Sequence, residues 1–68
     1  MQTIGERIRH IRKTNKLTQA DFSKKLCVSG SHIANIENNK DNPSNAVIRL
    51  ISTTFNINEG WIKNGLDG

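Results

Sequence analysis

The stretch TQADFSKKLCVSGSHIANIENNK, residues 18–40, decides the fold of this 68-residue chain. Thr18 stands where a helix N-cap is favoured, because its hydroxyl can accept a backbone N–H of the first turn. The apolar spacing that follows predicts a short helix over residues 18–26. Ser29 has the same role for a second helix over residues 29–38. The stretch therefore predicts two short helices joined by a tight turn.

Small and apolar side chains set how these two helices pack. Ser23 is small at the place where the helices must cross closely, and the turn falls at Cys27 and Val28. The helix over residues 18–26 is expected to bury Ala20, Phe22, Ser23 and Leu26. The angle between the helices is expected to be fixed by Phe22, Leu26, Val28, Ile33 and Ile36. This is the geometry of a helix-turn-helix, whose second helix enters the major groove of DNA.

The outward face of the second helix carries short, uncharged side chains. Helical spacing, with Ile33 and Ile36 buried, turns outward Ser31, Ala34, Asn35 and Asn38. Asparagine can bond adenine through two hydrogen bonds, and alanine can contact a thymine methyl group. The pattern therefore indicates base reading; the alternative is a polar exposed helix that has no partner.

Three more helices are predicted from capping residues that precede apolar runs. The first covers residues 3–15, where Thr3 and Glu6 have capping-box spacing. The fourth begins at Pro43 and Ser44, and its apolar residues are Ala46, Val47, Leu50, Ile51 and Phe55. The last begins after Asn58 and carries Trp61 and Ile62. Helix ends are expected at Asn15, Asn38, Asn39 and Gly65, with Leu66 as a hydrophobic contact beyond the last one. The chain is predicted to be all-α, with five helices.

Composition indicates one small domain over residues 1–68 that has little material for a catalytic cleft. The lone Cys27 has no partner for an internal disulfide, and no Cys/His cluster suggests zinc or another metal. A reducing, cytoplasmic compartment is expected. No apolar run has membrane-spanning length, and the N-terminus lacks a signal-peptide core.

The basic residues are concentrated in the N-terminal part of the chain. Residues 1–25 carry seven Lys and Arg against two acidic residues, a balance of +5, while residues 26–68 carry −1, for the net charge of +4. A basic half attracts polyanions, most commonly nucleic acid, although a solvated basic helix is an equal alternative on charge alone.

The chain resembles the Xre family of helix-turn-helix proteins, which includes phage repressors and Cro proteins. The resemblance is carried by Leu17, Thr18, Gln19, Ala20, Phe22, Leu26, Val28, Ser29, Ile33, Ile36, Glu37 and Lys40. It continues from the Ile8–Arg12 stretch to the Phe55–Ile62 ending, and so covers nearly the whole chain. It implies a compact five-helix bundle of the lambda-repressor-like type, with the helix-turn-helix at about residues 18–38.

The resemblance also implies residue roles. Positions that read bases in the family are occupied by Gly30, Ser31, His32 and Asn35. Positions that contact DNA phosphates are occupied by Thr18, Gln19, Ser29, Asn38 and Lys40. Arg12 and Glu37 occupy the positions of a structural ion pair between the first and third helices. No cofactor or small-molecule ligand is implied.

Several positions depart from the family pattern. Cys27 replaces the usual glycine of the turn, which costs about 1 kcal/mol if the backbone there is left-handed. Gly30 offers no side chain, so specificity is expected to depend on Ser31, Asn35, His32 and DNA shape. Ser23 and Asn39 replace the usual alanine and glycine.

Some roles stay open. His32 either meets a phosphate or packs over the helix predicted at residues 18–26, and His10 is expected to be exposed. Trp61 is expected to be a core plug over the fourth helix, with a ligand platform as the alternative, and its neighbourhood is also a candidate dimer contact.

The expected function is a sequence-specific transcriptional regulator, a repressor that binds double-stranded operator DNA as a homodimer with half-sites about 34 Å apart. Its setting would be the cytoplasm of a bacterium or a phage-infected host cell. The alternative is an antitoxin or accessory regulator that acts mainly through a protein partner. An enzyme has no support, because Ser, His and Cys lack catalytic spacing. A headpiece of a longer repressor would fit the ending just after Gly65.

Overall fold

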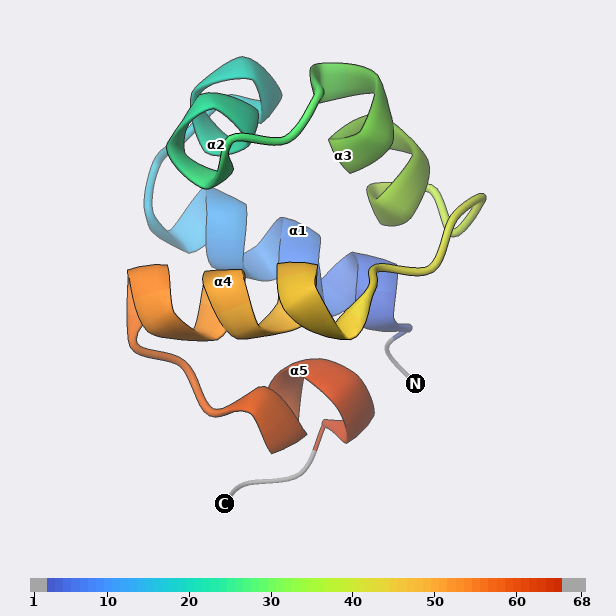
Figure 1. Cartoon of the computed structure of the whole chain (residues 1–68), viewed down its shortest axis with the longest axis vertical. Coiled ribbons are helices and arrows are strands. Elements are labelled where there is room, and N and C mark those ends of the chain that lie inside the picture. Colours follow the sequence, from blue (N-terminus) through green and yellow to red (C-terminus); the bar gives the residue numbers. More distant parts are fainter. Residues whose placement is uncertain (1–2, 66–68) are drawn as a thin grey trace.

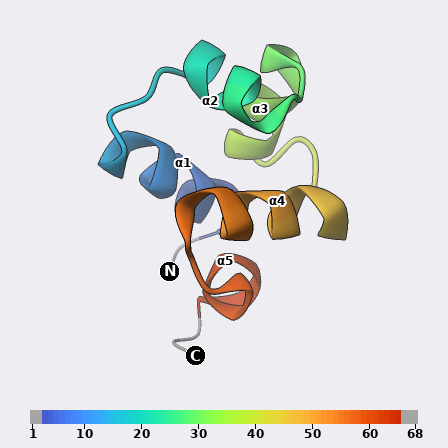
Figure 2. The same ribbon diagram turned by 60° about the vertical axis from the view of Figure 1, so that its left-hand side comes forward.

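The computed structural model describes residues 3–65, and within that range it contains five α helices and no strand. The helices are α1 (Ile4–Thr14), α2 (Gln19–Leu26), α3 (Gly30–Glu37), α4 (Asn45–Phe55) and α5 (Glu59–Asn64). In Figure 1, α2 and α3 lie at the top, α1 and α4 cross the middle and α5 lies below; Figure 2 shows the same order after a turn of 60°. The predicted all-α, five-helix architecture is confirmed.

Every helix begins after one of the N-cap residues that the sequence predicts. The side chains of the caps accept a backbone N–H three residues on, at Thr3, Thr18, Ser29, Ser44 and Asn58. The backbone N–H of Thr3 also donates to the Glu6 carboxylate, which completes the capping box. Each cap satisfies a helix-end N–H that has no acceptor within the helix, and this local requirement explains why the starts were predictable.

The helix ends have the expected left-handed geometry except at Asn15 and at Asn38, which has φ −91°. Cys27, Asn39 and Gly65 are left-handed, with φ of 56°, 62° and 73°. Asn15, however, has φ −91° and is not the left-handed stop that was expected. Its side-chain amide donates to the carbonyl oxygen of Ile11 at 2.7 Å, and the left-handed conformation falls on Lys16 instead. The predicted contact at Leu66 lies outside the described residues.

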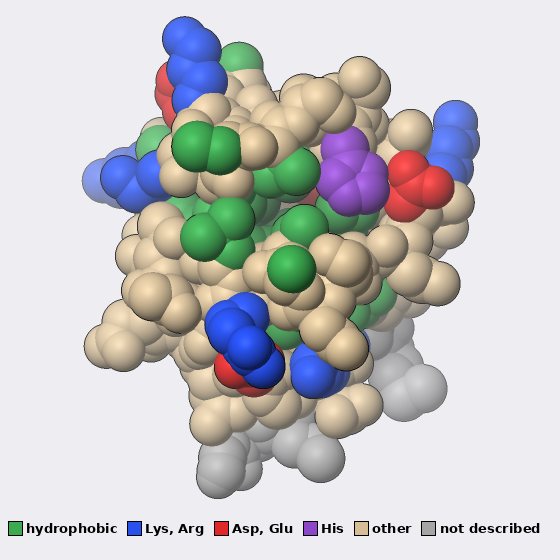
Figure 3. All heavy atoms as spheres, in the orientation of Figure 1, with side chains coloured by type: hydrophobic (Ala, Val, Ile, Leu, Met, Phe, Trp, Pro, Cys, Tyr) green, Lys and Arg blue, Asp and Glu red, His purple; other side chains and the backbone are tan. Residues whose placement is uncertain are grey.

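One apolar core joins the helices. Its buried residues are Ile8, Ile11, Phe22, Leu26, Ile33, Ile36, Ile48, Ile51 and Ile62. Stacking of Phe22 on Phe55, with ring centroids 5.4 Å apart, ties α2 to α4. On the face drawn in Figure 3, further hydrophobic side chains gather where α2 and α4 meet.

One expected buried position, Ala20, is corrected, and the structure shows which face of α4 is buried. Ala20 is exposed rather than buried, because it is two residues from Phe22 and so faces nearly the opposite side of α2. In α4 the deeply buried residues are Ile48 and Ile51, while Leu50 is 41% exposed. The helical spacing of the apolar residues therefore predicted α4, but it did not show which face of that helix is buried.

Trp61 lies beside α1 and is half-buried. It packs against the core, and its ring centroid is 6.1 Å from that of His10. His10 is exposed, as expected, and still contacts the indole. Trp61 is therefore only partly a core residue.

Gly5 is the point of closest approach between α1 and α3. A Cβ at this position would overlap the carbonyl oxygen of Ile36 and would lie 2.7 Å from Oδ1 of Asn39. Backbone cannot move aside as a flexible side chain can. The C-terminal end of α3 therefore rests directly on the first turn of α1, which only glycine permits.

None of the helices within residues 3–65 combines the length and the apolar character needed to cross a membrane.

The left-handed turn residue generates a first prediction. Cys27 is exposed and has φ 56°, so Cys27→Gly should raise the free energy of unfolding by about 1 kcal/mol and the Tm by roughly 5 °C. Thermal unfolding measures this. Cys27→Ala is the control, because alanine removes the thiol but keeps the strain. Equal stabilisation by both variants would contradict the explanation.

The close contact at Gly5 generates a second prediction. Gly5→Ala should lower the free energy of unfolding by roughly 2 kcal/mol, although alanine normally favours a helix. Gly30→Ala is the matched control, because a Cβ there meets only Ser23 Oγ, at an ordinary 3.8 Å. Urea unfolding compares the two variants. If Gly5→Ala leaves the free energy of unfolding unchanged, α1 and α3 can move apart without loss of stability.

Candidate nucleic-acid interface

The outward face of α3 is the one that the sequence predicts. Ser31 and Asn38 are exposed and Asn35 is half-buried, while Ile33 and Ile36 on the other side are completely buried. The helix is thus anchored by apolar side chains and presents uncharged polar groups. Short polar groups of this kind can approach base edges without charge repulsion from phosphate.

The flank of α3 that faces α2 carries Gly30. Gly30 is close to Ser23, whose hydroxyl donates to the carbonyl oxygen of Ala20 at 2.9 Å. Both crossing residues are small, and the Ser23 hydroxyl is satisfied within its own helix. The helix crossing predicted at Ser23 is therefore present, and Gly30 lies at its rim.

His32 lies on the other flank of α3. Its Nδ1 is 3.6 Å from Oδ2 of Asp41, in the segment that follows the helix. Two residues of helix separate His32 by about 200° from Gly30, the residue close to α2, so this position favours the phosphate alternative over packing against α2.

The residues expected at phosphates lie at the ends of the two helices. Thr18 and Ser29 are exposed N-caps, and Gln19 is the half-buried first residue of α2. Asn38 and Lys40 are exposed after α3. The backbone N–H of Lys40 donates to the carbonyl oxygen of Asn35 at 2.8 Å, so this segment is held against the end of α3.

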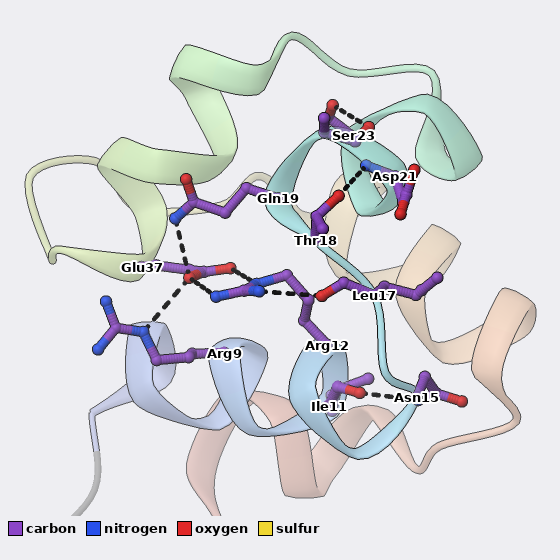
Figure 4. A network of polar contacts seen from close by, with 11 residues as sticks. Arg9, Ile11, Arg12, Asn15, Leu17, Thr18, Gln19, Asp21, Ser23 and Glu37 are labelled. Carbon is purple, nitrogen blue, oxygen red and sulfur yellow. Dashed lines mark hydrogen bonds and ion pairs between the residues drawn. The ribbon is translucent and has the colours of Figure 1, made fainter.

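A buried carboxylate joins α1, α2 and α3 beneath this surface (Figure 4). The Glu37 side chain has no exposed area, and Arg12 donates to both of its oxygens, at 2.8 and 3.0 Å. A third N–H of Arg12 donates to the carbonyl oxygen of Leu17, at 3.0 Å. The ion pair that the resemblance implies is present, and it also fixes the connection between α1 and α2.

Two further donors complete the network. Gln19 Nε2 lies 3.2 Å and Arg9 Nε 3.4 Å from Oε1 of Glu37. Neither contact was expected from the sequence. The signal available for Arg9 was its spacing of three residues from Arg12, which places the two on neighbouring turns of α1.

The environment of Glu37 lowers the pKa of its carboxyl group. Burial is the largest single effect and acts to raise the pKa. Hydrogen bonds from Arg12, Gln19 and Arg9, together with the charge of Arg12, outweigh burial and hold the pKa below its ordinary value. Glu37 is therefore ionised when the protein is folded at neutral pH.

A groove of about 360 Å³ lies elsewhere, between the end of α1 and the α4–α5 connection. It is lined by His10, Ile11, Thr14, Asn15, Asn56, Ile57, Asn58 and Trp61. None of these residues belongs to α2 or α3. Within residues 3–65, no group of three His, Cys, Asp or Glu side chains is placed to hold a metal ion.

The buried ion pair generates a third prediction. Arg12→Ala should lower the free energy of unfolding at pH 7 by roughly 2 kcal/mol, because it leaves a buried carboxylate with weaker partners. Glu37 stabilises the fold above its unfolded pKa, near 4.3, and loses this effect as the pH falls through the lower folded pKa. The difference between wild type and variant should therefore narrow below about pH 4.

Urea unfolding at several pH values measures this dependence. Arg49→Ala is the control, since Arg49 is 75% exposed and lies 3.8 Å from Glu59, and it should change stability little. If Arg12→Ala lowers the free energy of unfolding by the same amount at every pH, the effect comes from packing and not from the charge of Glu37.

The chain is similar in sequence to a known domain family and to known regulatory proteins. The family model described as a helix-turn-helix domain matches residues 5–68. The immunity repressor protein of Bacillus phage phi105 is 38% identical over 55 residues, which cover 81% of this chain and 38% of that protein. Antitoxin PezA of Streptococcus pneumoniae serotype 4 is 33% identical over 54 residues, covering 79% of this chain and 34% of PezA. The chain thus spans little more than a third of these relatives.

A solved structure shares the whole fold. The P22 c2 repressor protein, crystallised with synthetic operator 9T in the presence of Tl+, superposes with a TM-score of 0.88 and 29% identity. The match covers 97% of this chain and all of that chain. The five-helix arrangement is therefore the lambda-repressor-like one. With the family match, the crossing of α2 and α3 and the outward polar face of α3, the chain belongs to the Xre-type helix-turn-helix domain family.

Proposed function

We propose that this chain is the sequence-specific DNA-binding domain of a phage or prophage type repressor, with α3 in the major groove of double-stranded DNA. The observation that carries the proposal is the uncharged, outward face of α3, held rigidly by the buried Ile33 and Ile36. It is supported by the similarity to the P22 c2 repressor, whose structure was determined on operator DNA, and to the phage phi105 immunity repressor.

Base reading is proposed for four residues of α3. Asn35 and Ser31 are the principal candidates, because their side chains are short and point away from the core. His32 would contact the edge of the groove from the flank of the helix. Gly30 would allow close approach without contributing a side chain, so DNA shape is expected to supply part of the specificity.

Phosphate contact is proposed for residues at the ends of the helices. They are Thr18, Gln19, Ser29, Asn38 and Lys40. The backbone N–H groups at the start of α2 and α3 favour an anion, which supports this assignment. The balance of +5 over residues 1–25 favours approach to DNA before specific contacts form.

A homodimer on a two-fold operator is part of the proposal. One α3 reads only a few base pairs, and two copies with half-sites about 34 Å apart would place both recognition helices on the same side of the duplex. The proposal places the chain in the cytoplasm of a bacterium, where such an operator would be found.

The similarity to Antitoxin PezA supports a second candidate. In that case α3 would bind DNA in the same way, and regulation would come from a protein partner. Co-purification of the natural full-length protein with a partner would distinguish this role from a free-standing repressor.

The division between base and phosphate contacts generates a fourth prediction. Asn35→Ala should weaken binding to the selected operator by about 1–3 kcal/mol and weaken binding to random DNA much less. Lys40→Ala should weaken both equally and flatten the dependence of affinity on salt. Operator duplexes are first selected by the wild-type protein from a random pool, and fluorescence anisotropy then measures the affinities. Equal effects of Asn35→Ala on both DNAs would count against base reading by α3.

A further inference from the structure

Arg9 lies on α1, outside the helix-turn-helix, and yet its side chain reaches the network beneath α3. Its Nε is 3.4 Å from Oε1 of Glu37, and 44% of its side chain is exposed. Arg12, from the next turn of α1, is only 12% exposed. The two arginines therefore share one carboxylate in different environments, one enclosed by the protein and the other open to solvent.

The fold has little need of Arg9. Arg12 alone donates to both oxygens of Glu37, at 2.8 and 3.0 Å, and Gln19 adds another bond to Oε1. The contact of Arg9 is the longest of the four. Two guanidinium groups and one carboxylate also leave a surplus of one positive charge. The carboxylate is thus satisfied without Arg9, and the surplus charge is on the side that solvent reaches.

The guanidinium of Arg9 is turned so that its two terminal amino groups are available. Because Nε is the atom that faces Glu37, both Nη groups point away from the carboxylate and away from Arg12 (Figure 4). Among the described residues, no hydrogen bond from either Nη group is present. An arginine in this state has the planar pair of donors that suits a phosphate group.

The Arg9 side chain lies next to Gln19, which belongs to the candidate interface. Gln19 Nε2 and Arg9 Nε lie 3.2 and 3.4 Å from the same oxygen of Glu37, so the two side chains are neighbours although they come from different helices. Each amide nitrogen of this kind carries two hydrogens, and only one of them is needed for Glu37. Because both side chains converge on one oxygen, we expect a phosphodiester that contacts Gln19 to be within reach of the long Arg9 side chain.

We propose that Arg9 is a further phosphate-binding residue, which acts with Gln19 on one phosphodiester of the DNA backbone, and that Glu37 positions it. This inference rests on the proposed function, because it extends the same DNA interface from the helix-turn-helix to α1. Arg9 contributes charge and affinity without reading sequence, so its effect is the same on operator and on random DNA.

The test is the salt dependence of DNA binding in Arg9→Gln. The probes are a duplex selected by the wild-type protein from a random pool and a scrambled duplex of the same length, each titrated between about 50 and 200 mM salt. The slope of log affinity against log salt should fall by about 0.9 per bound protomer on both duplexes. Arg9→Lys should keep most of the slope, and the Tm of both variants should stay close to that of the wild type.

Arg49→Gln is the matched control, because it removes the same charge from α4, at a side chain that is 75% exposed and pairs with Glu59 rather than with Glu37. Its slope should remain close to that of the wild type. An unchanged slope in Arg9→Gln, or a decrease no larger than that in Arg49→Gln, would overturn the role of Arg9. If the wild-type protein binds neither duplex, the proposed function itself fails, and this result is distinct from the first.

Discussion

The arrangement of α1, α2 and α3 depends on one buried carboxylate. Glu37 is the last residue of α3, has no exposed side-chain area and receives hydrogen bonds from Arg12 and Arg9 of α1 and from Gln19 of α2. An unpaired charge at this position would cost several kcal/mol. The three helices can therefore satisfy the carboxylate only in this arrangement, which makes the contact a determinant of geometry as well as of stability.

This constraint acts on the surface that α3 presents. Apolar side chains hold α3 from below, and Glu37 fixes the direction of its C-terminal end. Gly5 lets that end rest on the backbone of α1. The outward residues Ser31 and Asn35 thus project from a helix that is held at both ends. Groups that read bases need this kind of support, because an error in helix placement moves every contact together.

The charges around α3 complement this rigid, neutral surface. Positive side chains lie at its margins, with Lys40 after the helix and the Arg9 guanidinium on α1, while Glu37 is neutralised below it. Phosphate contacts give affinity and register, and uncharged groups give discrimination between bases.

The sequence by itself determined where each helix begins, where the turn lies and which face of α3 is polar, because caps and helical period depend on residues at most four apart. The tertiary structure alone decided the exposure of Ala20, the contact of Gly5 with Ile36 and the place of Arg9 beside Gln19. Those features join residues on different helices, or depend on which side of a helix another element covers. They follow from how the helices pack together, and local propensity does not contain that information.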